Sequence, residues 1–136
     1  MKFIDTNVFL RVLTRDDPAK ADACTALLQR IERGEEQAFT IEAAIVEVMF
    51  VLLSRRNYNM SRQDVAIRIT TLLSIRNLQV TARTELLRAC ALIAEYPHLD
   101  VADALAVAYM ERADVTEVVS YDSDFDVIPG ITRIEP

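Results

Sequence analysis

The 136-residue sequence is short of several residue types that mark whole classes of protein. It contains two Gly and four Pro, which excludes a fibrous or disordered chain, because such chains are rich in one or both residues. Its longest apolar run, Val48 to Leu53, is far shorter than the ~20 residues of a membrane span, and Asp5 interrupts the N-terminal run before a signal peptide can form. The composition therefore predicts one globular, helix-rich domain over residues 1–136, and we expect it to be cytoplasmic.

Cysteine and histidine are also scarce. Cys24 and Cys90 lie apart in helix-like apolar contexts, so we expect two reduced core residues and no metal or redox pair. His98 is the only histidine and is expected on the surface at a helix entry, which leaves no zinc site and no Ser-His-Asp or Cys-His set. The 21 acids exceed the 15 bases to give a net charge of −6, which argues against nucleic-acid binding if the acids are spread over the surface.

Short apolar runs alternate with longer helical patterns along the chain. The expected strands are 2–5, 37–40, 78–81, 117–120 and 131–134. The expected helices are 8–14, 18–33, 42–55, 61–73, 84–95 and 101–113, and residues 121–130 form a loop with room for one helical turn. Strands separated by long helical stretches predict an α/β fold with a mainly parallel sheet covered on both faces.

Several acids stand where a solvated charge is not expected. Asp5 and Asp122 follow the first and fourth expected strands, at the ends of a parallel sheet where ligands bind. Glu47 is the only charge in the apolar stretch 43–53, and Asp103 has Ala and Val neighbours. A lone buried carboxylate costs several kcal/mol unless it is paired or bound to a metal. These acids, with Asp124, could form a ring of carboxylates.

Each acid also has a purely structural interpretation. Asp5 and Asp100 could cap helices, and Glu47 could pair with a distant Arg or lie on a narrow exposed stripe. The alternating acids of the loop 121–126 could simply be solvated. Taken together, however, four or five carboxylates without a nearby His or Cys fit a hard cation such as Mg²⁺ or Mn²⁺ far better than zinc.

The order of these motifs resembles the PIN-domain family, and within it the VapC-type toxin ribonucleases. The resemblance covers the whole chain and also includes the C-terminal stretch from Asp126 to Pro136. Its four motifs are a strand ending in Asp5-Thr6-Asn7, a Glu inside an apolar helix at Glu47, the run Asp103-Ala104-Leu105, and the loop from Ser120 to Phe125.

The resemblance implies a three-layer α/β/α fold with a five-stranded, mainly parallel sheet, and cleavage of RNA with one or two Mg²⁺ or Mn²⁺ ions. It also implies a cognate antitoxin whose peptide fills the groove, and a homodimer, which excess apolar residues near Phe50 and Leu72 also favour. Carried over by position, the acidic quartet is Asp5, Glu47, Asp103 and Asp122, with Asp124 as a fifth candidate and Thr6, Asn7 and Ser120 as supporting polar residues.

Metal binding would also account for the charge. Two divalent ions would bring the net charge from −6 to about −2 and turn a repulsive pocket into one that attracts phosphate. Arg55, Arg56, Arg62 and Arg68 surround one helix connection and could contact RNA or an acidic antitoxin peptide, or could form a solvated basic face.

Two other classes of function fit parts of the pattern. Receiver domains and phosphohydrolases with an aspartate nucleophile also place an Asp after the first strand and use Mg²⁺. Both need a later Lys, whereas no Lys follows Lys20 here, and the phosphohydrolase needs Asp-x-Asp where this chain has Asp5-Thr6-Asn7. A domain that only binds RNA or protein is the third possibility, and a test of metal dependence separates it from a nuclease.

Overall fold

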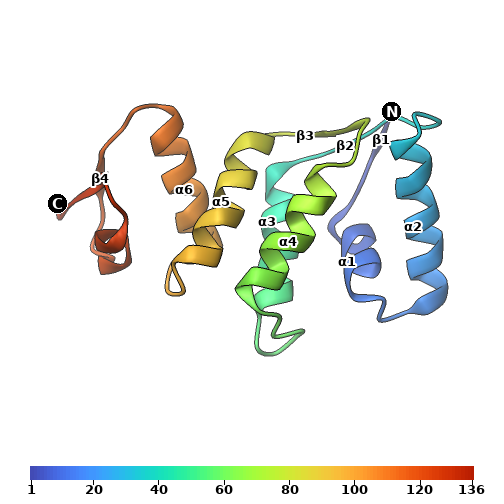
Figure 1. Ribbon diagram of the computed structural model, residues 1–136, viewed down its shortest axis with the longest axis horizontal. Coiled ribbons are helices and arrows are strands. Elements are labelled where there is room, and N and C mark those ends of the chain that lie inside the picture. Colours follow the sequence, from blue (N-terminus) through green and yellow to red (C-terminus); the bar gives the residue numbers. More distant parts are fainter.

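The structure is a computed structural model that describes residues 1–136 (Figure 1). Its helices are α1 (Thr6–Thr14), α2 (Pro18–Glu32), α3 (Glu42–Leu53), α4 (Arg62–Leu73), α5 (Arg83–Glu95) and α6 (Val101–Arg112), with a short 3₁₀ helix η1 (Ser123–Val127). Its strands are β1 (Lys2–Phe3), β2 (Ala38–Thr40), β3 (Leu78–Val80), β4 (Glu117–Val119) and β5 (Thr132–Ile134). The element types and their order agree with the sequence analysis, and no helix is both long and apolar enough to span a membrane.

The strands form two separate parallel sheets. β1, β2 and β3 form one sheet in that order, with Phe3 opposite Phe39, and β4 pairs with β5 in the other. The α/β class and the parallel pairing are therefore confirmed, whereas the single five-stranded sheet is not observed.

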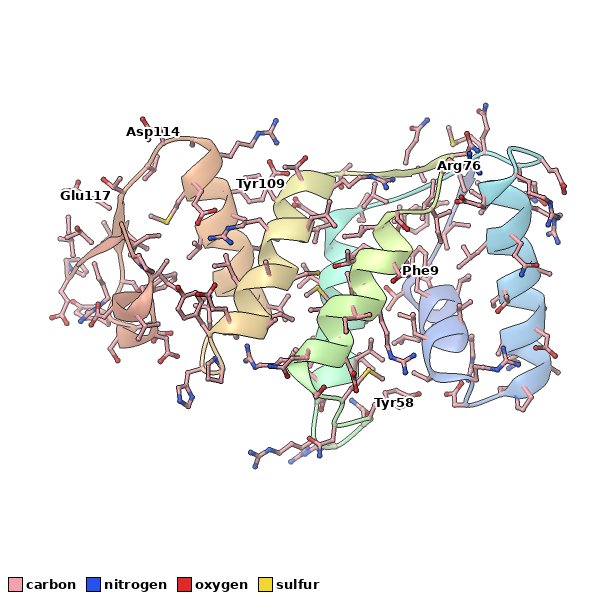
Figure 2. All side chains as sticks on the ribbon, viewed as in Figure 1. Phe9, Tyr58, Arg76, Tyr109, Asp114 and Glu117 are labelled. Atoms are coloured by element: carbon pink, nitrogen blue, oxygen red, sulfur yellow. The ribbon has the colours of Figure 1, made fainter.

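The division of the sheet follows from how the last helix packs. α6 packs against α5, and the turn that contains Asp114 leads directly from α6 into β4 near Glu117 (Figure 2). β4 therefore lies at the end of the molecule beyond α6, whereas β1 lies beyond α3 and α4 (Figure 1).

Helix capping sets two of the boundaries near the predicted site. The Asp5 carboxylate accepts a hydrogen bond from the Asn7 backbone N–H at 3.4 Å, so α1 begins at Thr6 and not at Val8 as the sequence suggested. The Asp100 carboxylate accepts one from the Asp103 backbone N–H at 2.8 Å and begins α6. The capping interpretation is correct for both acids, and it leaves the remaining lone pairs of each carboxylate free.

One continuous core lies beneath the helices. α3 contributes four fully buried side chains to it, and Cys90 is buried while Cys24 is half-buried, with both thiols free. The four α3 residues are Ile45, Val48, Met49 and Leu52. Because these residues share one face of α3, the helix has a defined outer face, which matters for Glu47 below.

Arg62 is part of this framework. Its guanidinium donates hydrogen bonds to the carbonyl oxygens of Ile93, Tyr96 and Leu99 at 3.2, 3.1 and 2.6 Å. These carbonyls belong to the end of α5 and the connection to α6, so Arg62 ties α4 to the segment that positions Asp100.

We predict that Arg62→Ala lowers the free energy of unfolding by about 2 kcal/mol, because three carbonyls lose a charged donor. Urea unfolding measures this change. The matched control is Arg55→Ala, which removes an exposed Arg and should change stability by less than about 0.5 kcal/mol. Equal effects of the two substitutions would contradict this structural role.

Candidate active site

The first group of predicted site residues lies where α1 meets α3. Thr6 is buried, and its hydroxyl donates a hydrogen bond to Oε2 of Glu47 at 3.0 Å. This contact joins residues 41 positions apart and holds the Glu47 carboxylate near the end of β1, where Asp5 follows the strand. Thr6 thus orients the Glu47 carboxylate.

The second group lies where α6 meets the loop after β4. Burial, together with the negative charges of Asp100, Asp122 and Asp124, raises the pKa of Asp103 to about 6. Such an effect requires the four carboxylates to be close together with little compensating positive charge. Asp122 and Asp124 thus lie near enough to Asp103 for their charges to affect its pKa.

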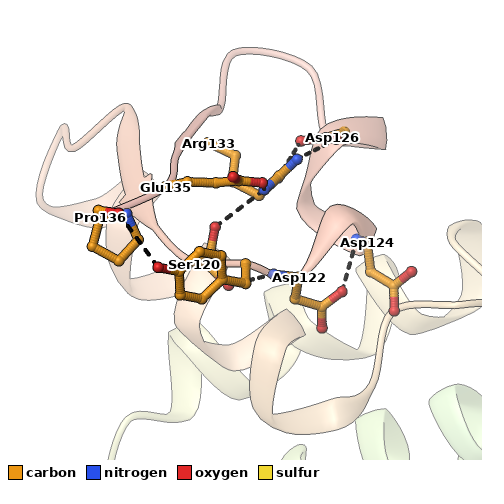
Figure 3. Close-up of polar contacts among 8 residues, drawn as sticks. Ser120, Asp122, Asp124, Asp126, Arg133, Glu135 and Pro136 are labelled. Carbon is orange, nitrogen blue, oxygen red and sulfur yellow. Dashed lines mark hydrogen bonds and ion pairs between the residues drawn. The ribbon is translucent and has the colours of Figure 1, made fainter.

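Local hydrogen bonds shape the loop that carries Asp122 and Asp124 (Figure 3). The Ser120 hydroxyl accepts a hydrogen bond from the Asp122 backbone N–H, and the Asp122 carboxylate accepts one from the Asp124 backbone N–H, each at 2.9 Å. Arg133 pairs with Asp126 at 2.8 Å and donates to the Ser120 carbonyl at 3.2 Å. Asp126 therefore has a cationic partner that lowers its pKa, whereas Asp122 and Asp124 have none.

The two groups do not converge. A cavity of about 460 Å³ between α3 and α6 is lined by Glu47 on one side and Asp100 on the other. No three His, Cys, Asp or Glu side chains lie close enough to hold a metal ion. The groups stay apart because β1 and β4, which carry Asp5 and Asp122 at their ends, belong to different sheets.

The expected burial of Glu47 is wrong. Glu47 is exposed and shares the outer face of α3 with Ala43 and Phe50. Phe50 is 67% exposed. This is the narrow exposed stripe that the sequence left open as an alternative. The free-energy cost of burying an unpaired carboxylate therefore does not apply to Glu47, and it applies only in part to Asp103, which is half-buried.

The four predicted basic contacts divide into two pairs. Arg62 donates to the backbone as described, and Arg68 donates to the Leu13 carbonyl at 3.1 Å. Arg55 and Arg56 are exposed in the turn after α3 and form no side-chain hydrogen bond or ion pair within the chain. Every other basic side chain forms an ion pair or a hydrogen bond, so Arg55 and Arg56 are the free cations of the molecule.

The sequence analysis missed the exposed side chain of Phe50 beside the site. Phe50 and Asp100 line the groove next to Glu47, and Phe50 stands three residues after Glu47 on the same helix. That spacing was the available signal, because residues three apart share a helix face. Of the two residues that marked the helices with excess apolar side chains, Phe50 is exposed and Leu72 is buried.

Comparison with known proteins identifies the class to which this site belongs. The model of the PIN domain family matches residues 2–131, so the chain belongs to the PIN-domain family. The VapC ribonuclease Mb1869c of Mycobacterium bovis and Ribonuclease VapC13 of Mycobacterium tuberculosis are each 28% identical over 136 residues, covering 98% of this chain and 99% of the relative. The predicted resemblance to VapC-type proteins is confirmed.

Among solved structures, the chain is similar to Mycobacterium tuberculosis VapC20, described as a sarcin-ricin loop cleaving toxin. The two chains share 14% identity with full coverage of both, and the TM-score is 0.39. This likeness is too low to support an argument about the site.

Asp103 should make stability depend on pH. The pKa of Asp103 in the folded protein is about 6, above the ~3.9 of an Asp in the unfolded chain. The protonated side chain therefore makes its full contribution to the free energy of unfolding below about pH 4, and this contribution is lost as the pH rises through 6. Without metal, Asp103→Asn should therefore be more stable than wild type by about 1 kcal/mol at pH 7 and equal to it at pH 4.

Unfolding in chelator at the two pH values measures this difference. Asp126→Asn serves as the control because the pKa of Asp126 is lowered by Arg133, so this variant should be less stable than wild type at pH 7. If the difference between Asp103→Asn and wild type is the same at both pH values, Asp103 is not in the crowded acidic environment described here.

Proposed function

We propose that the protein is an Mg²⁺- or Mn²⁺-dependent endoribonuclease that hydrolyses RNA phosphodiester bonds, as the toxin of a type II toxin-antitoxin pair. The observation that carries the proposal is the group of uncompensated carboxylates around Asp103, on a chain of the PIN-domain family. The curated relatives, which are named as VapC ribonucleases, favour RNA as the substrate.

The chemistry of the donor set fits a hard divalent cation. All the donors are carboxylate oxygens, and none of them forms an ion pair within the chain. The residues that would hold the ion are Asp5, Glu47, Asp103, Asp122 and Asp124. When bound, such ions lower the pKa of an attacking water and stabilise the departing 3′ oxygen.

The protein's own residues would prepare this reaction. Thr6 holds the Glu47 carboxylate in one orientation, and Ser120 fixes the start of the loop that carries Asp122. Asn7 lies in the first turn of α1 and lines a cavity with Arg11 and Lys20, where it would face the substrate backbone. Because no His or Lys stands in the site, proton removal from water relies on the carboxylates and the ion together.

A complete metal site requires the group around Glu47 and the group around Asp103 to come together. We propose that β1 and β4 pair edge to edge in that arrangement. β1 is an edge strand with one partner, and β4 has one partner in a two-stranded sheet, an arrangement that is marginal by itself. Pairing these parallel strands would give the expected five-stranded sheet. It would also place Asp5 and Asp122 at adjacent strand ends.

The proposed partners follow from the same surface. Arg55 and Arg56, the free cations, would contact the RNA backbone or an acidic antitoxin peptide. A homodimer is proposed through the face of α4 and α5, where Ile67 is 65% exposed beside an apolar groove of about 510 Å³ that Leu87 also lines.

Cleavage of single-stranded RNA should require millimolar Mg²⁺ or Mn²⁺ and should stop in chelator. Asp5→Asn, Glu47→Gln and Asp103→Asn should each slow cleavage by roughly 100-fold or more, because each removes a charged ligand but keeps the side-chain shape. Gel-resolved cleavage of labelled RNA measures both effects.

The matched control is Asp126→Asn, which removes an acid of the same loop that already has Arg133 as its partner, and it should cleave at close to the wild-type rate. A folded Asp103→Asn protein that cleaves as fast as wild type would refute the assignment. Binding of RNA without cleavage at any metal concentration would identify a binding module instead.

A further inference from the structure

Phe50 is an exposed aromatic ring beside the proposed catalytic carboxylate. It lies three residues after Glu47 on α3, which corresponds to about 4.5 Å along the helix axis at 1.5 Å per residue. Its side chain is 67% exposed, although the other face of α3 is fully buried in the core. A large apolar ring at this position costs hydration free energy in the free protein, and a bound ligand that covers it would recover that cost.

The groove on either side of Phe50 has the size for a flat ligand. The cavity of about 460 Å³ that contains Glu47 and a second cavity of about 220 Å³ share Phe50, Asp100 and Val101. Ala43 and Ala102 line the first cavity, so the space between α3 and α6 is lined by small side chains. Ser54 and Arg62 add a hydroxyl and a guanidinium to the second.

The charges around the groove select among possible ligands. Without a bound cation, Glu47 and Asp100 at its walls repel a phosphate or an acidic peptide, whereas the Asp100 carboxylate can accept a hydrogen bond from the exocyclic amino group of a nucleobase. Arg55 and Arg56, the free cations, follow Phe50 by five and six residues and can pair with phosphates outside the groove. A neutral, planar base would match the groove, and the anionic backbone to which it is joined would match the two cations outside the groove.

We propose that Phe50 is the stacking platform for one unpaired base of the RNA substrate, next to the phosphate that is cleaved. The inference rests on the proposed ribonuclease function and adds to it the residue that would hold one base of the substrate. Paired bases cannot reach the groove because their faces are already stacked, whereas single-stranded RNA is commonly recognised through aromatic side chains.

The test uses ten-nucleotide single-stranded RNAs that carry the fluorescent base 2-aminopurine at successive positions. Each is titrated with the full-length protein in Ca²⁺ and, separately, in chelator. Wild type should quench the fluorescence strongly at one position, through stacking on Phe50. Phe50→Leu should abolish this quenching and weaken binding by about tenfold, whereas Phe50→Trp should retain both.

The matched control is Phe39→Leu. It makes the same chemical change at a partly exposed Phe that packs against the Phe3 ring at 5.3 Å between centroids, and that does not line the groove. It should bind and quench like wild type. Thermal unfolding should show both Leu variants to be folded, since Phe50 contributes little to the core.

Equal quenching and binding by wild type and Phe50→Leu, in a protein that still cleaves RNA, would overturn the base site and leave the nuclease function standing. Loss of a protein partner by Phe50→Leu with unchanged RNA binding would also overturn it, because the groove would then be a protein-docking surface. Failure of wild type to bind or cleave any of the RNAs would overturn the proposed function as well.

Discussion

Mutual repulsion among carboxylates is the constraint on which the arrangement of this molecule depends. Most of the bases form ion pairs with acids elsewhere on the surface, such as Arg133 with Asp126. No acid of the proposed site forms an ion pair, and burial together with the charges of neighbouring acids raises the pKa of Asp103. Like charges that face one another in this way are retained at a cost in stability, which is typical of functional sites rather than of solvated surface.

The acids stand in two separate groups because the packing of α6 places β4 in a different sheet from β1. Thr6 fixes the Glu47 carboxylate on one side, and the start of α6 places Asp103 near the loop after β4 on the other. The groove between α3 and α6 separates them and exposes Phe50. In our account, a divalent cation supplies the missing attraction, and the RNA base occupies the apolar part of the groove.

The elements could be predicted from the sequence because hydrophobic period, caps and turn residues act locally, as Asp100 shows at the start of α6. The pairing of the strand edges could not be predicted from the sequence, because the position of β4 depends on the direction of α6 and not on the residues of β4. The burial of Glu47 was predicted wrongly because α3 is apolar on all sides, so its outer face is defined only by packing. The role of Arg62 depends on carbonyls more than thirty residues away, for which the sequence holds no signal.

The central claim is that one bound cation joins the two carboxylate groups, and a double-mutant cycle on Mn²⁺ affinity tests it most directly. Titration calorimetry would compare wild type, Glu47→Gln, Asp103→Asn and the double variant. We predict that each single change weakens binding by at least about tenfold and that the double change adds little, which gives a coupling of about 1 kcal/mol or more. Strictly additive losses, or a single change without effect, would show that Glu47 and Asp103 do not share an ion.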